Sequence, residues 1–362
     1  MSNGFDFDGT SNKITKKTIA SFESIKDICK GKKVCIFLGA GFSMAWDRNY
    51  PSSDKVFTIG KSEADEHKEH HPFFSLSKDF NIDWVDDKNK DNSEPFKLFK
   101  YNIDIYKRYP SLLPSHLDGH TVSMLEDDVK IYIKNKFKEM VGEDNFCFKI
   151  NALSDTQNHI VDFFEEMQKL ESLDIITTNY DVVIDNILNR LKGKRSIIRG
   201  VPVFIDGKHK CPQSGGIGLY KLNGGFEVIE DGNKFRIDYD SILNEKVAPN
   251  IILPSKEQNY SDKYFKNVFI KSSSQLRNAD IIIFIGYSFP KEDLIINFLL
   301  KSFLDSTNKD KEIIIMSRNS DSAKKYREKA ISIFKELYEI GALHYLDASF
   351  TDMCKNIKNS NK

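Results

Sequence analysis

Residues 34–43 read VCIFLGAGFS, an apolar β-type run that leads straight into a glycine turn. A continuous apolar run is typical of a strand covered on both faces, as in a parallel sheet. Similar runs recur at 175–178, 197–203, 281–285 and 313–316. Apolar stripes at helical spacing lie between them, in 160–170, 183–191 and 326–337. The sequence therefore predicts an α/β fold, with a Rossmann-like, mostly parallel sheet and helices on both faces.

Residues 47–150 interrupt this alternation of strands and helices, because polar segments separate helical patterns such as 129–141. We expect an inserted, mainly helical subdomain here. The remaining segments, 18–46 and 151–355, would form the Rossmann domain, and 1–17 and 356–362 would be flexible ends. A chain of 362 residues is long enough for a main domain of about 200 to 250 residues and a second unit.

The composition is that of a soluble globular protein. The 53 basic and 53 acidic residues cancel, so no overall field attracts nucleic acid or an anionic membrane. No apolar run approaches the roughly 18 residues of a membrane span, and the polar start of the chain lacks a secretory pattern. Five cysteines are scattered singly, at Cys29, Cys35, Cys147, Cys211 and Cys354. We expect reduced, buried thiols in a cytoplasmic protein.

The turn after residues 34–38 contains Gly39 and Gly41 and precedes residues that can start a helix. Such a turn lets the backbone approach a phosphate, and the helix start offers free N–H groups. The third glycine of the usual dinucleotide fingerprint is missing, so a tight turn without a ligand explains this stretch equally well.

Polar residues also follow the other predicted strands. Thr177 to Asp181 (TTNYD) follows one, GYSF at 286–289 another, and Ser317, Arg318 and Asn319 a third. Polar side chains at the carboxyl ends of parallel strands lie where open α/β sheets bind ligands. The simpler alternative is that Asn179 and Asp181 only cap the next helix.

Three motifs in this order, GAGFS at 39–43, TTNYD at 177–181 and GYSF at 286–289, resemble the signature of the sirtuin-like family. The resemblance is to the branch that lacks a zinc ribbon and hydrolyses NAD in bacterial antiphage defence. It covers about residues 30–45 and 155–320. It implies an NAD glycohydrolase that releases nicotinamide and ADP-ribose.

The resemblance also implies which residues act. Asn179 and Asp181 would lie at the nicotinamide end, with Asn223 beside them, and the turn Gly39 to Ser43 would face the phosphates and the nicotinamide ribose. Further NAD contacts follow from the other strand ends. The full set of expected NAD-binding residues is Gly39, Ala40, Gly41, Phe42, Ser43, Thr178, Gly286, Ser288, Ser317 and Arg318.

Asn223 departs from the family pattern. The family ordinarily has Lys-Leu-His-Gly, with the histidine as general base, and this chain has KLNG at 221–224. An asparagine cannot accept a proton at neutral pH, and losing a general base typically costs about 10²- to 10⁴-fold in rate. Three alternatives remain open. Asn223 is native and chemistry relies on Asn179 and Asp181, or it was engineered to trap ligand, or the protein is an NAD or ADP-ribose sensor.

The chain also lacks the two C-x-x-C pairs that hold zinc in protein-deacylating sirtuins. The resemblance then favours NAD hydrolysis without zinc, and a hairpin at 228–237 is predicted at that place. It further implies a homo-oligomer and a second defence protein, such as an ATPase or a nucleotide sensor, with no membrane or sequence-specific nucleic acid as partner. Residues 47–150 are the expected contact surface.

Other polar clusters have simpler explanations. His67, His70 and His71 lie among carboxylates, but a solvated helix or loop is a better interpretation than a metal site. The lysines at 134–138 alternate with apolar residues and are expected on an exposed helix face. Nothing in the sequence places the remaining candidate bases near Asn179. They are His116, His120, His159 and His209.

Overall fold

The computed structural model describes most of the chain. The residues described are 18–19, 21–87, 92–147, 152–193, 195–205, 208–210, 215–232, 234–290, 293–305, 310–316, 321–346, 348–355 and 357.

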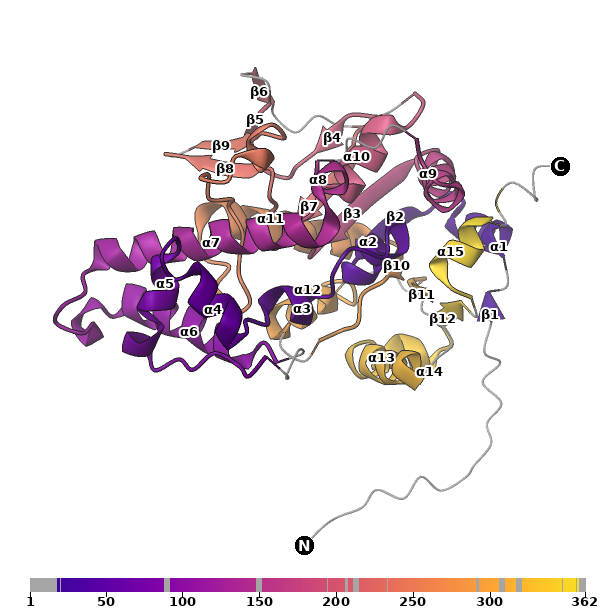
Figure 1. The fold of residues 1–362 in the computed structure, drawn as a ribbon. Coiled ribbons are helices and arrows are strands. Elements are labelled where there is room, and N and C mark those ends of the chain that lie inside the picture. Colours follow the sequence, from indigo (N-terminus) through magenta and orange to yellow (C-terminus); the bar gives the residue numbers. More distant parts are fainter. Residues whose placement is uncertain are drawn as a thin grey trace, which may run out of the picture.

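An eight-stranded parallel sheet forms the centre of the described chain (Figure 1). In spatial order its strands are β1 (Thr18–Ile19), β12 (Leu343–Leu346), β11 (Glu312–Met316), β10 (Ile281–Ile285), β2 (Lys33–Leu38), β3 (Ser172–Thr177), β7 (Ile217–Lys221) and β4 (Ile197–Ile198). The strand that opens the glycine turn, β2, lies between β10 and β3. The predicted α/β fold with a parallel sheet is confirmed.

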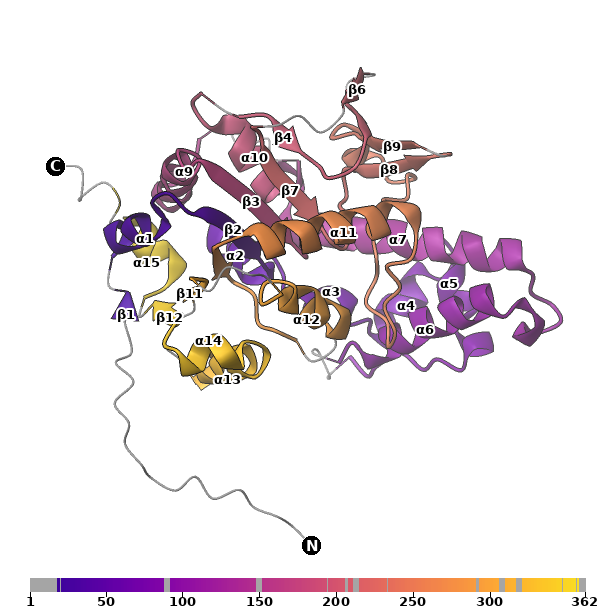
Figure 2. The same cartoon turned by 180° about the vertical axis from the view of Figure 1, so that it is seen from behind.

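Helices cover both faces of this sheet because successive side chains of each buried strand point to opposite sides. Ile36 packs into one apolar cluster and its neighbour Phe37 into another. The first cluster takes in α1 (Phe22–Cys29), α2 (Ala40–Trp46), α9 (Asp155–Met167), α10 (Val183–Arg190) and α15 (Phe350–Lys355). The second takes in α11 (Lys263–Asn278), α12 (Leu294–Lys301), α13 (Asp321–Ile333) and α14 (Lys335–Glu339). Figure 2 shows α11 lying across the sheet with α12 beside it.

One predicted strand, 197–203, is wrong as a single element. The structure divides it into β4 of the main sheet and β5 (Val203–Ile205) of a second sheet. Between them, Arg199 turns inward to buried carboxylates and Gly200 has a φ of +78°. Pro202, which has no N–H, follows. A left-handed residue and a proline end the extended run.

A small second sheet follows, with the strand order β6 (Lys208–Lys210), β5, β9 (Lys234–Ile237) and β8 (Val228–Asp231). Strands β8 and β9 pair antiparallel from Val228 with Ile237 to Asp231 with Lys234. The predicted hairpin is therefore confirmed. Its turn contains Gly232, with a φ of +61°, while Asn233 lies outside the described residues.

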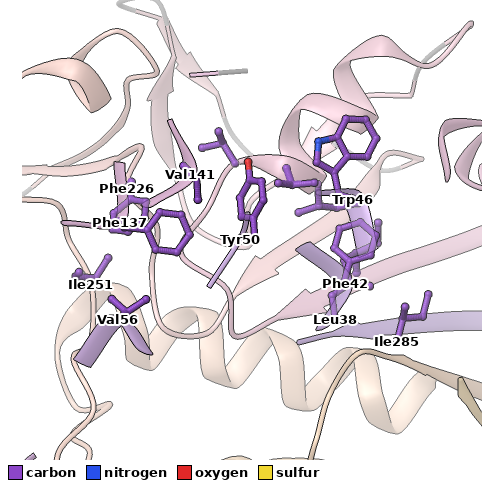
Figure 3. Packing of buried hydrophobic residues seen from close by; sticks show 14 of the residues in the cluster. Leu38, Phe42, Trp46, Tyr50, Val56, Phe137, Val141, Phe226, Ile251 and Ile285 are labelled. Atoms are coloured by element: carbon purple, nitrogen blue, oxygen red, sulfur yellow. The ribbon is translucent and has the colours of Figure 1, made fainter. Parts of the chain in front are cut away.

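Residues 47–150 are mainly helical where they are described. Their helices are α3 (Ser53–Phe57), α4 (Lys61–His67), α5 (Pro72–Ser75), α6 (Glu94–Arg108), α7 (Gly119–Val141) and α8 (Glu143–Phe146), with 3-10 turns at Ser77–Phe80 and Pro110–Leu112. A third 3-10 turn, Ser241–Leu243, lies beyond β9. Phe137 of α7 packs on Phe226, beside Tyr50 and the sheet cluster (Figure 3). The helices share a core with the sheet, and the domain boundaries stay a prediction.

The described cysteines follow the sequence expectation only in part. Cys29, Cys35 and Cys354 are buried free thiols, whereas Cys147 is half-buried. Burial raises the pKa of Cys29 to about 12. Cys211 lies outside the described residues. None of the helices in the described part of the chain is both long and apolar enough to cross a membrane.

The prediction of an exposed lysine face on 134–138 is wrong for Lys134, which is 1% exposed. Its Nζ donates to the carbonyl oxygens of Asn244 and Val247, both at 2.6 Å. On the same helix, Lys138 pairs with Glu245 at 2.7 Å. Helical spacing alone cannot show that a loop from about a hundred residues later covers this face. Helix α7 therefore fixes the segment 244–247.

We predict a pH-dependent difference in stability between the parent and Lys134→Met. Burial lowers the pKa of Lys134 from 10.5 to about 8. Between those values the unfolded chain holds a proton that the folded chain has lost, so the contribution of Lys134 to stability rises with pH. Below pH 8 that contribution is constant. Denaturant unfolding of the parent and of Lys134→Met at pH 7 to 10 measures this contribution as the difference between their free energies of unfolding. A difference that stays flat or falls above pH 8 contradicts the assignment.

Candidate active site

The candidate site lies at the carboxyl edge of the main sheet, where four neighbouring strands end. Leu38 of β2 pairs with Ile285 of β10 on one side and with Thr177 of β3 on the other. Thr177 in turn pairs with Lys221 of β7. The turns after these strands carry the motifs at 39–43, 177–181, 221–224 and 286–289, so the register places all four side by side. The topology thus brings together motifs that are up to about 250 residues apart in the sequence.

The glycine turns after β2 and β10 pack directly on each other. Gly39 and Gly41 donate their N–H groups to the carbonyls of Ile285 and Gly286, at 3.1 and 3.0 Å. A Cβ on Gly286, whose φ is +66°, would lie 2.2 Å from the nitrogen of Phe42. These glycines are therefore required for packing, whether or not a phosphate approaches them. Contact of Gly39 to Ser43 with NAD stays a prediction.

A chain of buried and partly buried hydrogen bonds links the turn after β2 to the turn after β3. The Asn179 Nδ2 donates to the carbonyl of Gly39 and to the Ser43 Oγ, both at 3.0 Å. The Ser43 hydroxyl then donates to the Asp181 Oδ2 at 2.7 Å. Thr177 supports the same turn, because its Oγ1 donates to the Leu38 carbonyl and accepts from the backbone N–H of Asn179. The amide plane of Asn179 is fixed by these contacts.

Asp181 has both carboxylate oxygens occupied. Oδ2 accepts from Ser43, and Oδ1 accepts from the backbone N–H of Val183 at 3.1 Å. Burial raises the pKa of Asp181, opposed by the charge of Lys221 and by these hydrogen bonds. The contact to Val183 means that Asp181 does hold the first residue of α10, as the helix-cap alternative requires. Asn179 makes no such contact with α10 among the described residues.

Asn223 follows β7 and is 8% exposed. Its Nδ2 donates to the Thr178 carbonyl at 3.3 Å, and its Oδ1 accepts from the Tyr260 hydroxyl at 2.7 Å. Burial raises the pKa of Tyr260, with nearby Asp293 and Tyr180 adding to the shift, so its hydroxyl keeps its proton and remains a donor. Both ends of the Asn223 amide thus have protein partners, which an imidazole would not reproduce in the same way.

The remaining predicted contacts lie around these turns. Thr178 accepts from Asn223 and donates its N–H to the Leu38 carbonyl at 3.3 Å. Ser288 is half-buried next to Phe289, whose φ of +49° is unusual for a side chain of that size. Nearby, the Tyr287 hydroxyl donates to Asp293 at 2.8 Å. Ser317 and Arg318 lie outside the described residues.

No described histidine side chain hydrogen-bonds to Asn179, Asp181 or Asn223. His116 instead lies 3.4 Å from Asp79, and His159 is on α9. The solvated interpretation of the histidines near residue 70 is partly wrong, because His71 pairs with Asp128 at 2.7 Å and His67 packs on Phe74. Within the described ranges, no three His, Cys, Asp or Glu side chains are arranged to hold a metal ion.

Sequence reasoning missed two residues at this edge. Tyr260 and Lys221 contact the candidate turns through side chains that are nearly fully buried. Tyr260 lies in a segment without a strand or helix, and no periodicity points to it. Lys221 was within a quoted motif, but a lysine at a strand end is ordinarily expected in solvent.

Comparison with known proteins gives one sequence match. A model of the SIR2-like domain matches residues 174–340. The matched region contains TTNYD, KLNG and GYSF but not the turn at 39–43. No curated protein matches the chain significantly in sequence.

Distantly similar solved structures include sirtuins. One, described as the structural basis of sirtuin substrate affinity, is 11% identical and has a TM-score of 0.46, with 95% of this chain and 100% of that chain covered. A second, Sir2 with a p53 peptide and NAD⁺, is 11% identical with a TM-score of 0.41, covering 94% and 98%. A third, Sir2 with an inhibitor, 2'-O-acetyl-ADP-ribose and a deacetylated p53 peptide, is 12% identical with a TM-score of 0.40, covering 94% and 99%.

We predict that Gly286→Ala destabilises the fold far more than Gly31→Ala. Both glycines have a positive φ, +66° and +70°, so both substitutions carry backbone strain of about 1 to 2 kcal/mol. Only the Cβ at 286 would collide with backbone, whereas nothing lies within 4 Å of a Cβ at 31. Overpacking adds about 1 to 3 kcal/mol. Urea unfolding of the two variants measures the difference, and equal losses would contradict the close packing of the two turns.

Proposed function

We propose that this chain cleaves NAD into nicotinamide and ADP-ribose, with Asn179 at the reacting centre. The observation that carries the proposal is the fixed amide of Asn179. Both hydrogens of its Nδ2 are donated, to Gly39 and Ser43. No described residue donates to its Oδ1, so this oxygen remains as an acceptor at the strand edge. The SIR2-like domain match, which includes Asn179, supports NAD as the ligand.

A free acceptor at this position suits the chemistry. An amide oxygen can accept from a water molecule or from a hydroxyl of the nicotinamide ribose, and so orient either one at the reacting carbon. Because the Nδ2 end of the Asn179 amide is already held, orienting the water molecule or the hydroxyl requires no rearrangement of Asn179 during the reaction. The role of Asn179 is positional, and it needs no change in protonation.

Absence of an imidazole at position 223 is compatible with this reaction. NAD carries its positive charge on the nicotinamide ring, so breaking the glycosidic bond releases neutral nicotinamide with the bonding electron pair and needs no general acid. The remaining ribose carbon becomes oxocarbenium-like and is stabilised by nearby negative charge. Asp181, held by Ser43 and Val183, supplies that charge. Water then adds to the carbon and releases a proton to solvent.

The proposed contacts for the rest of NAD follow the strand edge. The turn Gly39 to Ser43 would face the phosphates, Gly286 and Ser288 the adenosine, and Asn223 a ribose hydroxyl. No zinc enters the proposal, because the chain has no C-x-x-C pair. A cytoplasmic homo-oligomer that depletes NAD in antiphage defence, acting with a second protein that contacts residues 47–150, is the proposed setting. The resemblance of the sequence motifs supports that setting.

A second candidate is an NAD or ADP-ribose sensor that does not turn the ligand over. The observation that favours it is the pairing of Asn223 with Thr178 and Tyr260. That pairing fixes the Asn223 amide, which cannot accept a proton, at the position where the family has its histidine general base. Product formation by the parent chain separates the two candidates. Intact NAD after hours of incubation, with binding measurable by calorimetry, would favour the sensor.

We predict that Asn179→Ala lowers NAD cleavage at least tenfold, which is about 1.4 kcal/mol in the barrier, while the protein still folds, with a stability loss of about 1 to 3 kcal/mol from the lost hydrogen bonds to Gly39 and Ser43. Asn186→Ala is the matched control. Its Nδ2 donates to the Val182 carbonyl at the start of α10 at 2.9 Å, and among the described residues its side chain makes no hydrogen bond to Asn179 or Asp181, so activity is retained. Chromatography of released nicotinamide gives the rate. Asn179→Ala with more than a tenth of the parent rate would remove Asn179 from the reaction.

A further inference from the structure

Four buried charged side chains lie directly beneath the turn that carries Asn179 and Asp181. They are Asp185, Arg199, Lys221 and Glu227, and none is more than 5% exposed. Arg199 pairs with Asp185 at 2.5 Å and with Glu227. Lys221 pairs with the same two carboxylates, at 3.4 and 2.9 Å. Two cations and two carboxylates balance, so the cluster carries no net charge.

The two cations differ in what else they hold. Lys221 also donates to the backbone carbonyls of Asp181, at 2.7 Å, and Tyr180, at 3.3 Å. Arg199 makes no contact with that turn among the described residues. Among the described residues, the ammonium of Lys221 is therefore the one charged group of the cluster that hydrogen-bonds to this turn.

Stability alone gives a weak reason for four buried charges. Taking ions out of water is costly, and buried ion pairs can often be replaced by apolar side chains with no loss of stability. A fixed charge in the interior does hold the dipoles around it strongly, because the local dielectric constant is low. The ammonium of Lys221, together with the backbone N–H of Phe226 that donates to the Tyr180 carbonyl at 3.0 Å, leaves the backbone at 180–181 little freedom to rotate.

We propose that Lys221 is a positioning residue, which holds the backbone of Tyr180 and Asp181 so that the Asn179 amide and the Asp181 carboxylate face the reacting ribose. This inference rests on the proposed function. Asn179 immediately precedes the two residues whose carbonyls accept from Lys221. Its side-chain amide donates to Gly39 and Ser43, in the turn after the neighbouring strand β2. Rotation of the 180–181 backbone would break those contacts. Lys221 would then affect turnover without touching NAD.

Two charge-balanced double variants separate positioning from general stability. Lys221→Met/Glu227→Gln leaves the Arg199–Asp185 pair and removes the donor to the turn. Arg199→Met/Asp185→Asn leaves the Lys221–Glu227 pair and keeps that donor. Each variant removes one cation and one carboxylate from the same cluster. The donor to the 180–181 carbonyls is lost only in the first variant, whereas the second also changes the carboxylate that accepts from the Tyr239 hydroxyl.

Two readouts are measured on both variants. Amide hydrogen exchange of a peptide covering 178–183 reports the turn without any need for NAD. We expect exchange to rise at least tenfold in Lys221→Met/Glu227→Gln and to stay within threefold of the parent in the control. Steady-state cleavage of NAD should show kcat lowered at least tenfold in the first variant, with KM changed much less, and both constants nearly kept in the control.

Equal exchange and equal kcat in the two variants would overturn the assignment of Lys221. A parent that cleaves no NAD would instead contradict the proposed function, while the exchange result still decides whether Lys221 holds the turn. If Lys221→Met/Glu227→Gln does not fold, Lys221→Leu/Glu227→Gln takes its place. Leucine also lacks a donor to the two carbonyls, so the same two criteria apply to it.

Discussion

The buried hydroxyl of Ser43 holds the candidate site together. It accepts from Asn179 and donates to Asp181, so one side chain of α2 fixes two side chains of the turn after β3. A hydroxyl can do both because it is donor and acceptor at once. Loss of either contact would leave a buried polar group unpaired, which costs about 1 to 3 kcal/mol. The orientation of the Asn179 amide follows from this arrangement.

Neighbouring parts of the structure stabilise the Ser43 contacts from two sides. On one side, the glycine turns after β2 and β10 pack backbone to backbone, which sets where α2 begins. On the other side, Lys221 donates hydrogen bonds to the carbonyls of the turn after β3. Its ion pairs connect this turn to a buried cluster of charged side chains with no net charge. Further out, α7 holds the segment 244–247 through Lys134. That segment leads toward Tyr260, whose hydroxyl orients Asn223.

The sequence predicted the central strands because continuous apolar runs such as 34–38 and 281–285 have few alternatives to a buried parallel strand. The parallel arrangement also predicted that the motifs at 39–43, 177–181 and 286–289 share one edge. Burial of Lys134 and Lys221 was beyond prediction, since each depends on carbonyls supplied by distant segments. The short strands β7 and β12 were missed because their buried runs contain glycine or histidine.

The central claim is that NAD places its nicotinamide ribose against Asn179 at the carboxyl edge of the sheet. A crystal structure with a carbocyclic NAD analogue, whose glycosidic bond cannot be hydrolysed, tests it most directly. We expect a ribose hydroxyl within hydrogen-bond distance of the Asn179 Oδ1. A cavity of about 140 Å³ lies at the opposite edge, lined by Ser172, Asp174 and Gln275 among others. Density for the analogue there, with the Asn179 edge unchanged, would contradict the account.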